Sequence, residues 1–301
     1  MNARILIGDA RIRLGELADK SVQTCVTSPP YFGLRDYGHG DQMGLESTPD
    51  EYVKGIVDLF REVWRVLADD GTLWLNLGDS YASMTKGSGG KGKSTLGRQS
   101  DAARLRSQER QSSAVRSMEC GVPDKNLLGI PWRVAFALQA DGWYLRQDII
   151  WAKPNPMPES VRDRCTKSHE YLFLLSKNPR YYCDMEAIAE LAATGWNGSE
   201  FDTGPTGLRN KRDVWTIPTK PFKGAHFAVM PEALVEPCVL AGSRDGDLVL
   251  DPFAGTGTVG VVSLRHQRNF VGCELNPEYA EMARARIAND APLMNHVEVS
   301  L

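Results

Sequence analysis

The sequence predicts an α/β fold, with one sheet covered by helices on both faces. Three observations predict it. Apolar runs at residues 5–7 and 22–27 have the length of short buried strands. Residues 49–67 place apolar side chains at helical spacing. The strand-like residues 247–250 lead directly into a glycine-rich turn and a helix-like stretch.

Later segments continue the alternation of strands and helices. Gly71 separates the helix at residues 49–67 from the next strand, and Gly142 ends a second amphipathic helix. The expected strands are residues 73–77, 144–151, 170–176, 248–250 and 269–273, and the further expected helices are residues 131–140 and 277–289. Residues 84–118 lack this pattern, because they are rich in glycine and arginine and poor in apolar side chains.

Composition narrows the class of protein. The 301 residues can bury a sizeable core as one large domain or two modest ones. The formal net charge of −3 means that any basic face must be local. The six cysteines are scattered and no histidine stands at metal-ligand spacing, so neither a metal site nor a disulfide framework is expected. No apolar stretch approaches the roughly 18 residues of a membrane span, so we expect a soluble cytoplasmic protein without a membrane partner.

The tetrapeptide Ser28-Pro29-Pro30-Tyr31 follows the strand at residues 22–27. Two prolines fix φ and remove two backbone donors, so the serine hydroxyl and nearby carbonyls form a rigid, acceptor-rich edge. The exocyclic amine of a nucleobase offers only donors, and a tyrosine ring that stacks on a base contributes about 1–3 kcal/mol. The tetrapeptide therefore favours a site for a flipped-out base over a simple Pro-Pro turn.

A second motif occupies residues 251–260, with the sequence Asp-Pro-Phe-Ala-Gly-Thr-Gly-Thr-Val-Gly. Glycines at 255, 257 and 260 have the GxGxxG spacing, which lets backbone approach a ligand closely at a helix N-terminus. Glu274 ends the next apolar segment, where an acidic side chain can bind the hydroxyls of a ribose.

The same turn and acid also occur in nicotinamide-dependent dehydrogenases, which remain an alternative. Asp251 and Phe253 argue against that alternative, because a pyrophosphate gains nothing from another negative charge in the loop. A cationic ligand would gain from the carboxylate. The motif therefore favours a positively charged cofactor.

Residues 27–31 and 251–258 resemble the catalytic and cofactor motifs of S-adenosylmethionine-dependent DNA amino-methyltransferases, and their order resembles the beta class. The resemblance covers nearly the whole chain except about residues 84–125 and 186–220. It implies a Rossmann-like, seven-stranded methyltransferase sheet, mostly parallel with one reversed strand. Further matching segments are residues 8–10, 71–79, 151–158, 169–173 and 226–231.

The resemblance also implies the chemistry, which is direct methyl transfer from S-adenosylmethionine to an exocyclic amine. Ser28 and the Pro29 carbonyl would hold the amine in the turn completed by Pro30, and Tyr31 would stack on the base. The cofactor residues implied are Asp9, Phe227, Pro231, Asp251, Phe253, Gly255, Gly257, Thr258 and Glu274.

Other candidate groups are given ordinary roles. Cys25 precedes the catalytic loop and lacks the Pro-Cys setting of carbon-5 methylation, so that route is rejected. Asp36 and Asp79 are interpreted as turn or cap carboxylates, because the amine needs no dedicated base. His226 is interpreted as a core or capping residue.

The expected domain organisation separates catalysis from DNA recognition. Residues 1–185 and 223–301 would form the catalytic and cofactor core, with a flexible basic insertion at about residues 84–125. Residues 186–222 form the candidate target-recognition region, in which Trp196 and Trp215 either stack on bases or pack internally. The expected contacts to double-stranded DNA are Arg162, Arg164, Lys167, Arg209, Lys211 and Arg212.

Two aromatic amines, adenine N6 and cytosine N4, remain as candidates for the target. Serine at position 28 is typical of cytosine N4 enzymes in the family, whereas residues 32–38 resemble stand-alone beta-class enzymes that act on adenine N6. The sequence narrowly favours adenine. Beta-class relatives often pair, so a homodimer is expected, and a non-catalytic DNA-binding module is the remaining alternative. No restriction partner can be identified.

Overall fold

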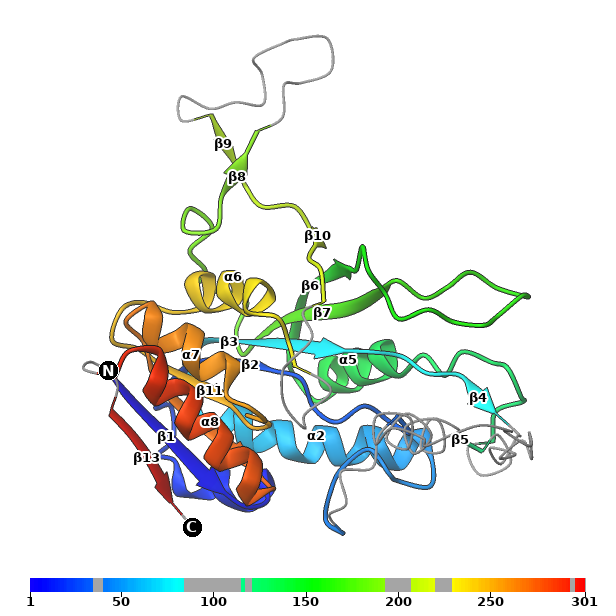
Figure 1. The fold of residues 1–301 in the computed structure, drawn as a ribbon, viewed down its shortest axis with the longest axis horizontal. Helices are drawn as coiled ribbons and strands as arrows, with labels where there is room; N and C mark the ends of the chain where they lie inside the picture. The colour runs from blue at the N-terminus through cyan, green and yellow to red at the C-terminus, as the bar shows by residue number, and fades with distance from the viewer. Residues whose placement is uncertain are drawn as a thin grey trace, which may run out of the picture.

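The computed structural model describes residues 1–34, 40–83, 115–116, 121–192, 207–219, 229–292 and 296–300. Within these residues nine strands form one sheet, in the order β10-β6-β7-β3-β2-β11-β12-β1-β13 (Figure 1). The strands are β1 (Asn2–Ile7), β2 (Val22–Thr27), β3 (Leu67–Leu77), β6 (Tyr144–Ala152), β7 (His169–Ser176), β10 (Val214–Thr216), β11 (Leu248–Asp251), β12 (Asn269–Glu274) and β13 (His296–Ser300).

Only β7 runs against its neighbours, since it pairs antiparallel with both β3 and β6, whereas the other described pairs in this sheet are parallel. The expected α/β class with one reversed strand is confirmed. The expected count of seven strands is wrong, because β10 and β13 extend the sheet at its two edges. Both are short and largely exposed, so they lack the apolar run that identifies a buried strand.

Two helical layers cover the sheet. The helices are α1 (Ala10–Arg13), η1 (Leu14–Glu16), α2 (Pro49–Val66), α5 (Ile130–Ala140), α6 (Glu232–Gly242), α7 (Thr258–Arg265) and α8 (Pro277–Asp290). α2 and α5 pack into one hydrophobic cluster, and α6, α7 and α8 pack into the other. Alternate residues of a strand enter opposite clusters, as Leu73 and Trp74 do. The expectation of helices on both faces is therefore confirmed.

The helix α2 begins with a capping box, in which Thr48 accepts from the backbone of Glu51 and the Glu51 side chain accepts from the backbone of Thr48. It ends one residue before Leu67, which already has an extended backbone and opens β3. The helix predicted over residues 49–67 is therefore correct, while β3 starts six residues earlier than its predicted strand at 73–77.

The helix α6 has no counterpart among the predicted elements. It contains Pro237, and its buried residues include Leu234, Val235, Cys238 and Val239. A helix that is apolar around much of its circumference lacks the one-sided spacing used to recognise amphipathic helices. Long-range packing against β2 and β3 stabilises it instead.

Two segments project from the body of the molecule (Figure 1). The connection between β6 and β7 extends beyond the end of the sheet at which the parallel strands have their carboxyl ends. A second projection carries the short antiparallel pair β8 (Glu190–Leu191) and β9 (Leu208–Arg209). The small strands β4 (Ala82–Ser83) and β5 (Val115–Arg116) lie beyond the same end of the sheet as the β6–β7 connection. Among the described residues, no helix is long and apolar enough to cross a membrane.

Candidate active site

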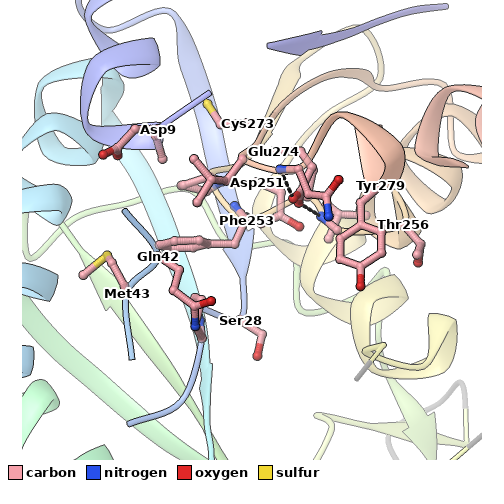
Figure 2. A pocket seen from close by; sticks show the side chains of 18 of the residues that line it. Asp9, Ser28, Gln42, Met43, Asp251, Phe253, Thr256, Cys273, Glu274 and Tyr279 are labelled. Atoms are coloured by element: carbon pink, nitrogen blue, oxygen red, sulfur yellow. Dashed lines mark hydrogen bonds between the residues drawn. The ribbon is translucent and has the colours of Figure 1, made fainter. Parts of the chain in front are cut away.

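A pocket opens where β1, β2, β11 and β12 reach their carboxyl ends, the edge at which ligands bind in sheets of this kind. Figure 2 shows the side chains that surround it. The sequence-predicted residues that line it are Asp9, Ser28, Pro30, Asp251, Phe253, Gly255, Thr258 and Glu274. The serine of the first motif and the carboxylates of the second therefore face one cavity, although more than 200 residues separate them in the sequence.

Asp251 ends β11 and is almost fully buried. One carboxylate oxygen accepts from the Thr27 hydroxyl at 2.6 Å and from the Phe253 amide at 3.0 Å. Burial raises the pKa of Asp251 to about 7, although both hydrogen bonds oppose that shift. The carboxyl group can therefore be neutral or charged near neutral pH.

Glu274 ends β12 and turns its carboxylate into the glycine-rich loop. Its two oxygens accept from the amides of Gly255 and Asn276, each at 2.8 Å (Figure 2). Burial raises the pKa of Glu274, against the backbone hydrogen bonds that lower it. These bonds hold the acid in place and fix the shape of the loop.

Gly257 precedes α7 in the left-handed region, with φ 76°. A Cβ atom there would lie 2.9 Å from the Cβ of Ala283, so only glycine lets the loop approach α8 this closely. Gly257 therefore packs the loop against α8, and it is not among the described residues that line the pocket. Thr258 begins α7, and its hydroxyl accepts from Arg286 at 2.8 Å.

The weaker cofactor assignments have mixed outcomes. Asp9 caps α1 by accepting from the Arg11 amide at 2.9 Å, and it lines the pocket. Pro231 lies at the N-terminus of α6, and its neighbours Val229 and Met230 line the pocket in its place. Phe227 and His226 lie outside the described residues.

Several lining residues were not predicted, notably Gln42, Met43 and Tyr279. The first two belong to the loop between β2 and α2, where no apolar period marks them. Tyr279 lies in the first turn of α8, the helix that follows Glu274 and β12 (Figure 2). Its place after a strand that ends at the ligand-binding edge was the available signal.

The residues Ser28–Tyr31 leave β2 at the pocket. Tyr31 is half-buried, and its ring lies so close to Gly78 that a Cβ atom there would come within 2.5 Å of Cε2. The Tyr31 hydroxyl lies 3.2 Å from Ser28 Oγ, 2.9 Å from Asn76 Oδ1 and 2.8 Å from Glu170 Oε2. Burial and the charge of Glu170 raise the pKa of Tyr31 well above its ordinary value, so the phenol is neutral.

Two groups with ordinary roles are placed as expected. Asp79 accepts from the amides of Gly129 and Ile130, and so caps α5. Cys25 is fully buried in β2, and burial raises the pKa of its thiol well above the usual range. A protonated, buried thiol is a poor nucleophile, which agrees with the rejection of carbon-5 chemistry. Asp36 lies outside the described residues.

The six cations expected to contact DNA lie on the two projecting segments. Arg162 is exposed, whereas Arg164 pairs with Glu159 and Lys167 donates to a backbone carbonyl. On the second projection, Arg209 and Arg212 share the carboxylate of Glu190, and Lys211 lies over the ring of Trp215. Trp215 itself is buried, so it packs internally, while Trp196 lies outside the described residues.

The fold and the pocket define an α/β methyltransferase that takes a cationic nucleoside cofactor. The model of the N6/N4 methyltransferase family, described as DNA methylase, matches residues 22–285, so the chain belongs to that family. It is an S-adenosylmethionine-dependent DNA methyltransferase of the adenine-N6 or cytosine-N4 type.

Individual relatives agree with this assignment. The chain is 50% identical to the Type II methyltransferase M.Cfr9I of Citrobacter freundii, over 96% of this chain and 88% of that protein. It is 51% identical to the Type II methyltransferase M.SmaI of Serratia marcescens, over 95% and 91%. A solved structure of a DNA modification methylase from Thermus thermophilus, complexed with S-adenosyl-L-methionine, has the same fold, with a TM-score of 0.63, 23% identity and 99% of both chains covered.

Proposed function

We propose that this enzyme methylates the exocyclic amine of a base flipped out of double-stranded DNA, as the modification enzyme of a restriction-modification system. The observation that carries the proposal is the shared pocket of Ser28, Asp251 and Glu274. An acceptor for an amine and two carboxylates for a cationic cofactor face one cavity. A dehydrogenase needs neither that serine nor the carboxylate of Asp251.

The residues of the pocket fit S-adenosylmethionine. Asp251 is a buried acid and Glu274 a half-buried one beside a glycine-rich loop, and Phe253 and Tyr279 supply aromatic rings. A cationic amino acid moiety suits Asp251, ribose hydroxyls suit Glu274, and an adenine ring suits the aromatic side chains. When bound, the cofactor supplies an electrophilic methyl group.

The catalytic contribution of the chain is to hold the amine. Ser28 Oγ and the Pro29 carbonyl accept the two amine hydrogens, while Pro30 keeps the turn rigid and Tyr31 supports the base. Holding the reacting atoms about 3 Å apart can supply several kcal/mol. Unstacking the base costs about a few kcal/mol, which binding to the duplex must offset.

Adenine N6 is the base that we infer by a narrow margin, with cytosine N4 as the second candidate. Ser28 is typical of cytosine enzymes in the family that the chain resembles. The argument for adenine is that residues 32–38 resemble stand-alone beta-class enzymes that act on adenine. Both amines can donate to the same acceptors, so the methylated nucleoside found in the product identifies the target base.

DNA recognition is assigned to the two projections. Residues 186–222, which include β8 and β9, would read the target sequence, and Arg162 on the β6–β7 connection would contact phosphate. We also propose a homodimer acting on DNA in the cytoplasm. A monomer mass of 33.3 kDa by light scattering at micromolar concentration would remove the dimer.

The decisive experiment incubates the protein with methyl-labelled S-adenosylmethionine and mixed-sequence duplex DNA, followed by mass spectrometry of the nucleosides. We expect N6-methyladenine, and a Ser28→Ala variant should lose that product while it retains cofactor affinity. N4-methylcytosine would keep the mechanism and correct the base. Neither product, from folded protein that binds the cofactor, would contradict the proposal.

A further inference from the structure

The hydroxyl of Tyr31 lies among three oxygen atoms, one from its own loop and two from distant strands. Ser28 Oγ lies 3.2 Å from it, Asn76 Oδ1 2.9 Å and Glu170 Oε2 2.8 Å. We infer that Glu170 and Asn76, through Tyr31, force Ser28 to act only as an acceptor toward the base, and so make the site select an amino group over an oxo group. The inference rests on the proposed function.

The direction of each hydrogen bond follows from counting protons. A carboxylate only accepts, and a phenol has a single proton to donate. The amide of Asn76 is oriented, because its Nδ2 donates to the Tyr171 carbonyl at 3.0 Å and its oxygen faces the phenol. Tyr31 therefore donates toward Glu170 or Asn76. Ser28 can bond to the phenol oxygen only by donating its own proton.

The carboxylate of Glu170 is held in place by an ion pair. Lys153 forms an ion pair with Glu170, and only 15% and 17% of the two side chains is exposed. The ammonium group also lies 4.1 Å from the ring centroid of Trp151. The ion pair occupies Oε1 of Glu170, and Oε2 faces the Tyr31 hydroxyl as an acceptor. Glu170, Asn76 and the Tyr31 hydroxyl act as positioning groups, because none of them lines the described pocket.

The consequence appears at the pocket, which Ser28 lines. With its proton committed to Tyr31, Ser28 Oγ presents lone pairs to the base. An amine donates to them, whereas the oxo group of uracil or hypoxanthine would place one acceptor against another. A site built on such hydrogen bonds rejects the wrong partner because a buried polar group is then unpaired.

The test measures binding of duplexes that carry an amino or an oxo base at the target position, opposite an abasic site so that neither base is paired. Cytosine is compared with uracil, or adenine with hypoxanthine, according to the product found. Unmodified protein should bind the amino duplex about 10-fold to 100-fold more tightly. Tyr31→Phe keeps the ring but frees the serine proton, so its ratio should fall to within about threefold of one.

Tyr52→Phe is the matched control, because it also removes one phenol hydroxyl from this region, one that donates to the Pro30 carbonyl at 2.9 Å. Its amino-to-oxo ratio should equal that of the unmodified protein. Glu170→Gln replaces an acceptor-only group with one that can donate to Tyr31, and should give an intermediate ratio; it also serves if Tyr31→Phe does not fold. An unchanged ratio in the folded Tyr31→Phe or Glu170→Gln variant overturns the inference, even where the unmodified protein methylates DNA. If the unmodified protein methylates no base, the proposed function fails instead.

Discussion

Tyr31 and Asp251 lie at the same edge of the sheet, but they have separable tasks. Tyr31 belongs to the loop after β2 and is anchored through Asn76 and Glu170, whereas Asp251 ends β11 and faces the cofactor side of the pocket. Their contacts do not overlap. Substitutions at the two positions should therefore affect different steps.

Tyr31→Ala should lower turnover about 5-fold to 100-fold, because stacking on the base is lost. The dissociation constant of the cofactor should change little. Asp251→Ala should raise the dissociation constant of the cofactor and change turnover little, since it removes the carboxylate from the cofactor side. Calorimetry with S-adenosylhomocysteine and single-turnover methylation separate the two effects. Loss of cofactor binding in Tyr31→Ala would contradict the role given to Tyr31.

The stability of the cofactor-free protein should depend on pH through Asp251. Its pKa is about 7 in the folded state and about 3.9 when unfolded, so the folded state binds the extra proton between these values. The contribution of Asp251 to the free energy of unfolding therefore falls as the pH rises from about 4 to about 7, and then stays level.

Asp251→Asn keeps an acceptor for Thr27 and Phe253 but avoids burying a charge. It should raise the free energy of unfolding more at pH 8 than at pH 5, by on the order of 1–3 kcal/mol. Thermal or urea unfolding at both pH values checks this. The exposed Asp58→Asn on α2 is the control. An equal gain at both pH values would show that burial of charge is not the cause.

At the scale of elements, the strands that carry the motifs were predicted because their apolar residues form short, uninterrupted runs. β2, β11 and β12 match the predicted segments to within one residue at each end. α6, β10 and β13 were not predicted. Their residues are stabilised by contacts with remote strands, and no local period records such contacts.

The projection that carries β8 and β9 can be tested as a unit. The two strands pair antiparallel, with Glu190 opposite Arg209, so a short glycine-serine turn can replace residues 191–208 without altering the main sheet. We expect cofactor affinity to be unchanged and sequence-specific methylation to be lost. Calorimetry and methylation of mixed-sequence DNA measure both. Retained specificity would place target recognition in another segment.

At the scale of the whole molecule, a net charge of −3 must be reconciled with binding to a polyanion. The exposed Arg162 lies on the connection that follows the carboxyl end of β6. Many other cations of the described residues are paired with carboxylates, as Arg209 is with Glu190. Affinity for DNA therefore depends on where the basic residues lie, and not on their number.

Arg162→Ala should weaken DNA binding without changing sequence preference, and should reduce the slope of log K against log salt by about one. Fluorescence anisotropy over a salt series measures this slope. Arg284→Ala on α8, an exposed arginine paired with Glu281, is the control and should leave the slope unchanged. A shift in sequence preference would mean that Arg162 reads a base.

The sequence by itself determined the α/β class, the strands of the central sheet and the two motifs, because apolar runs, helical spacing and glycine turns are local properties. Only the tertiary structure decided how the motifs cooperate. The Tyr31 hydroxyl meets Glu170 across 139 residues of sequence, and the pKa of Asp251 depends on burial by other segments. Such contacts form because the carboxyl ends of the parallel strands and the amino end of the antiparallel β7 meet at the same end of the sheet. The chemistry of the pocket is therefore a property of the folded sheet.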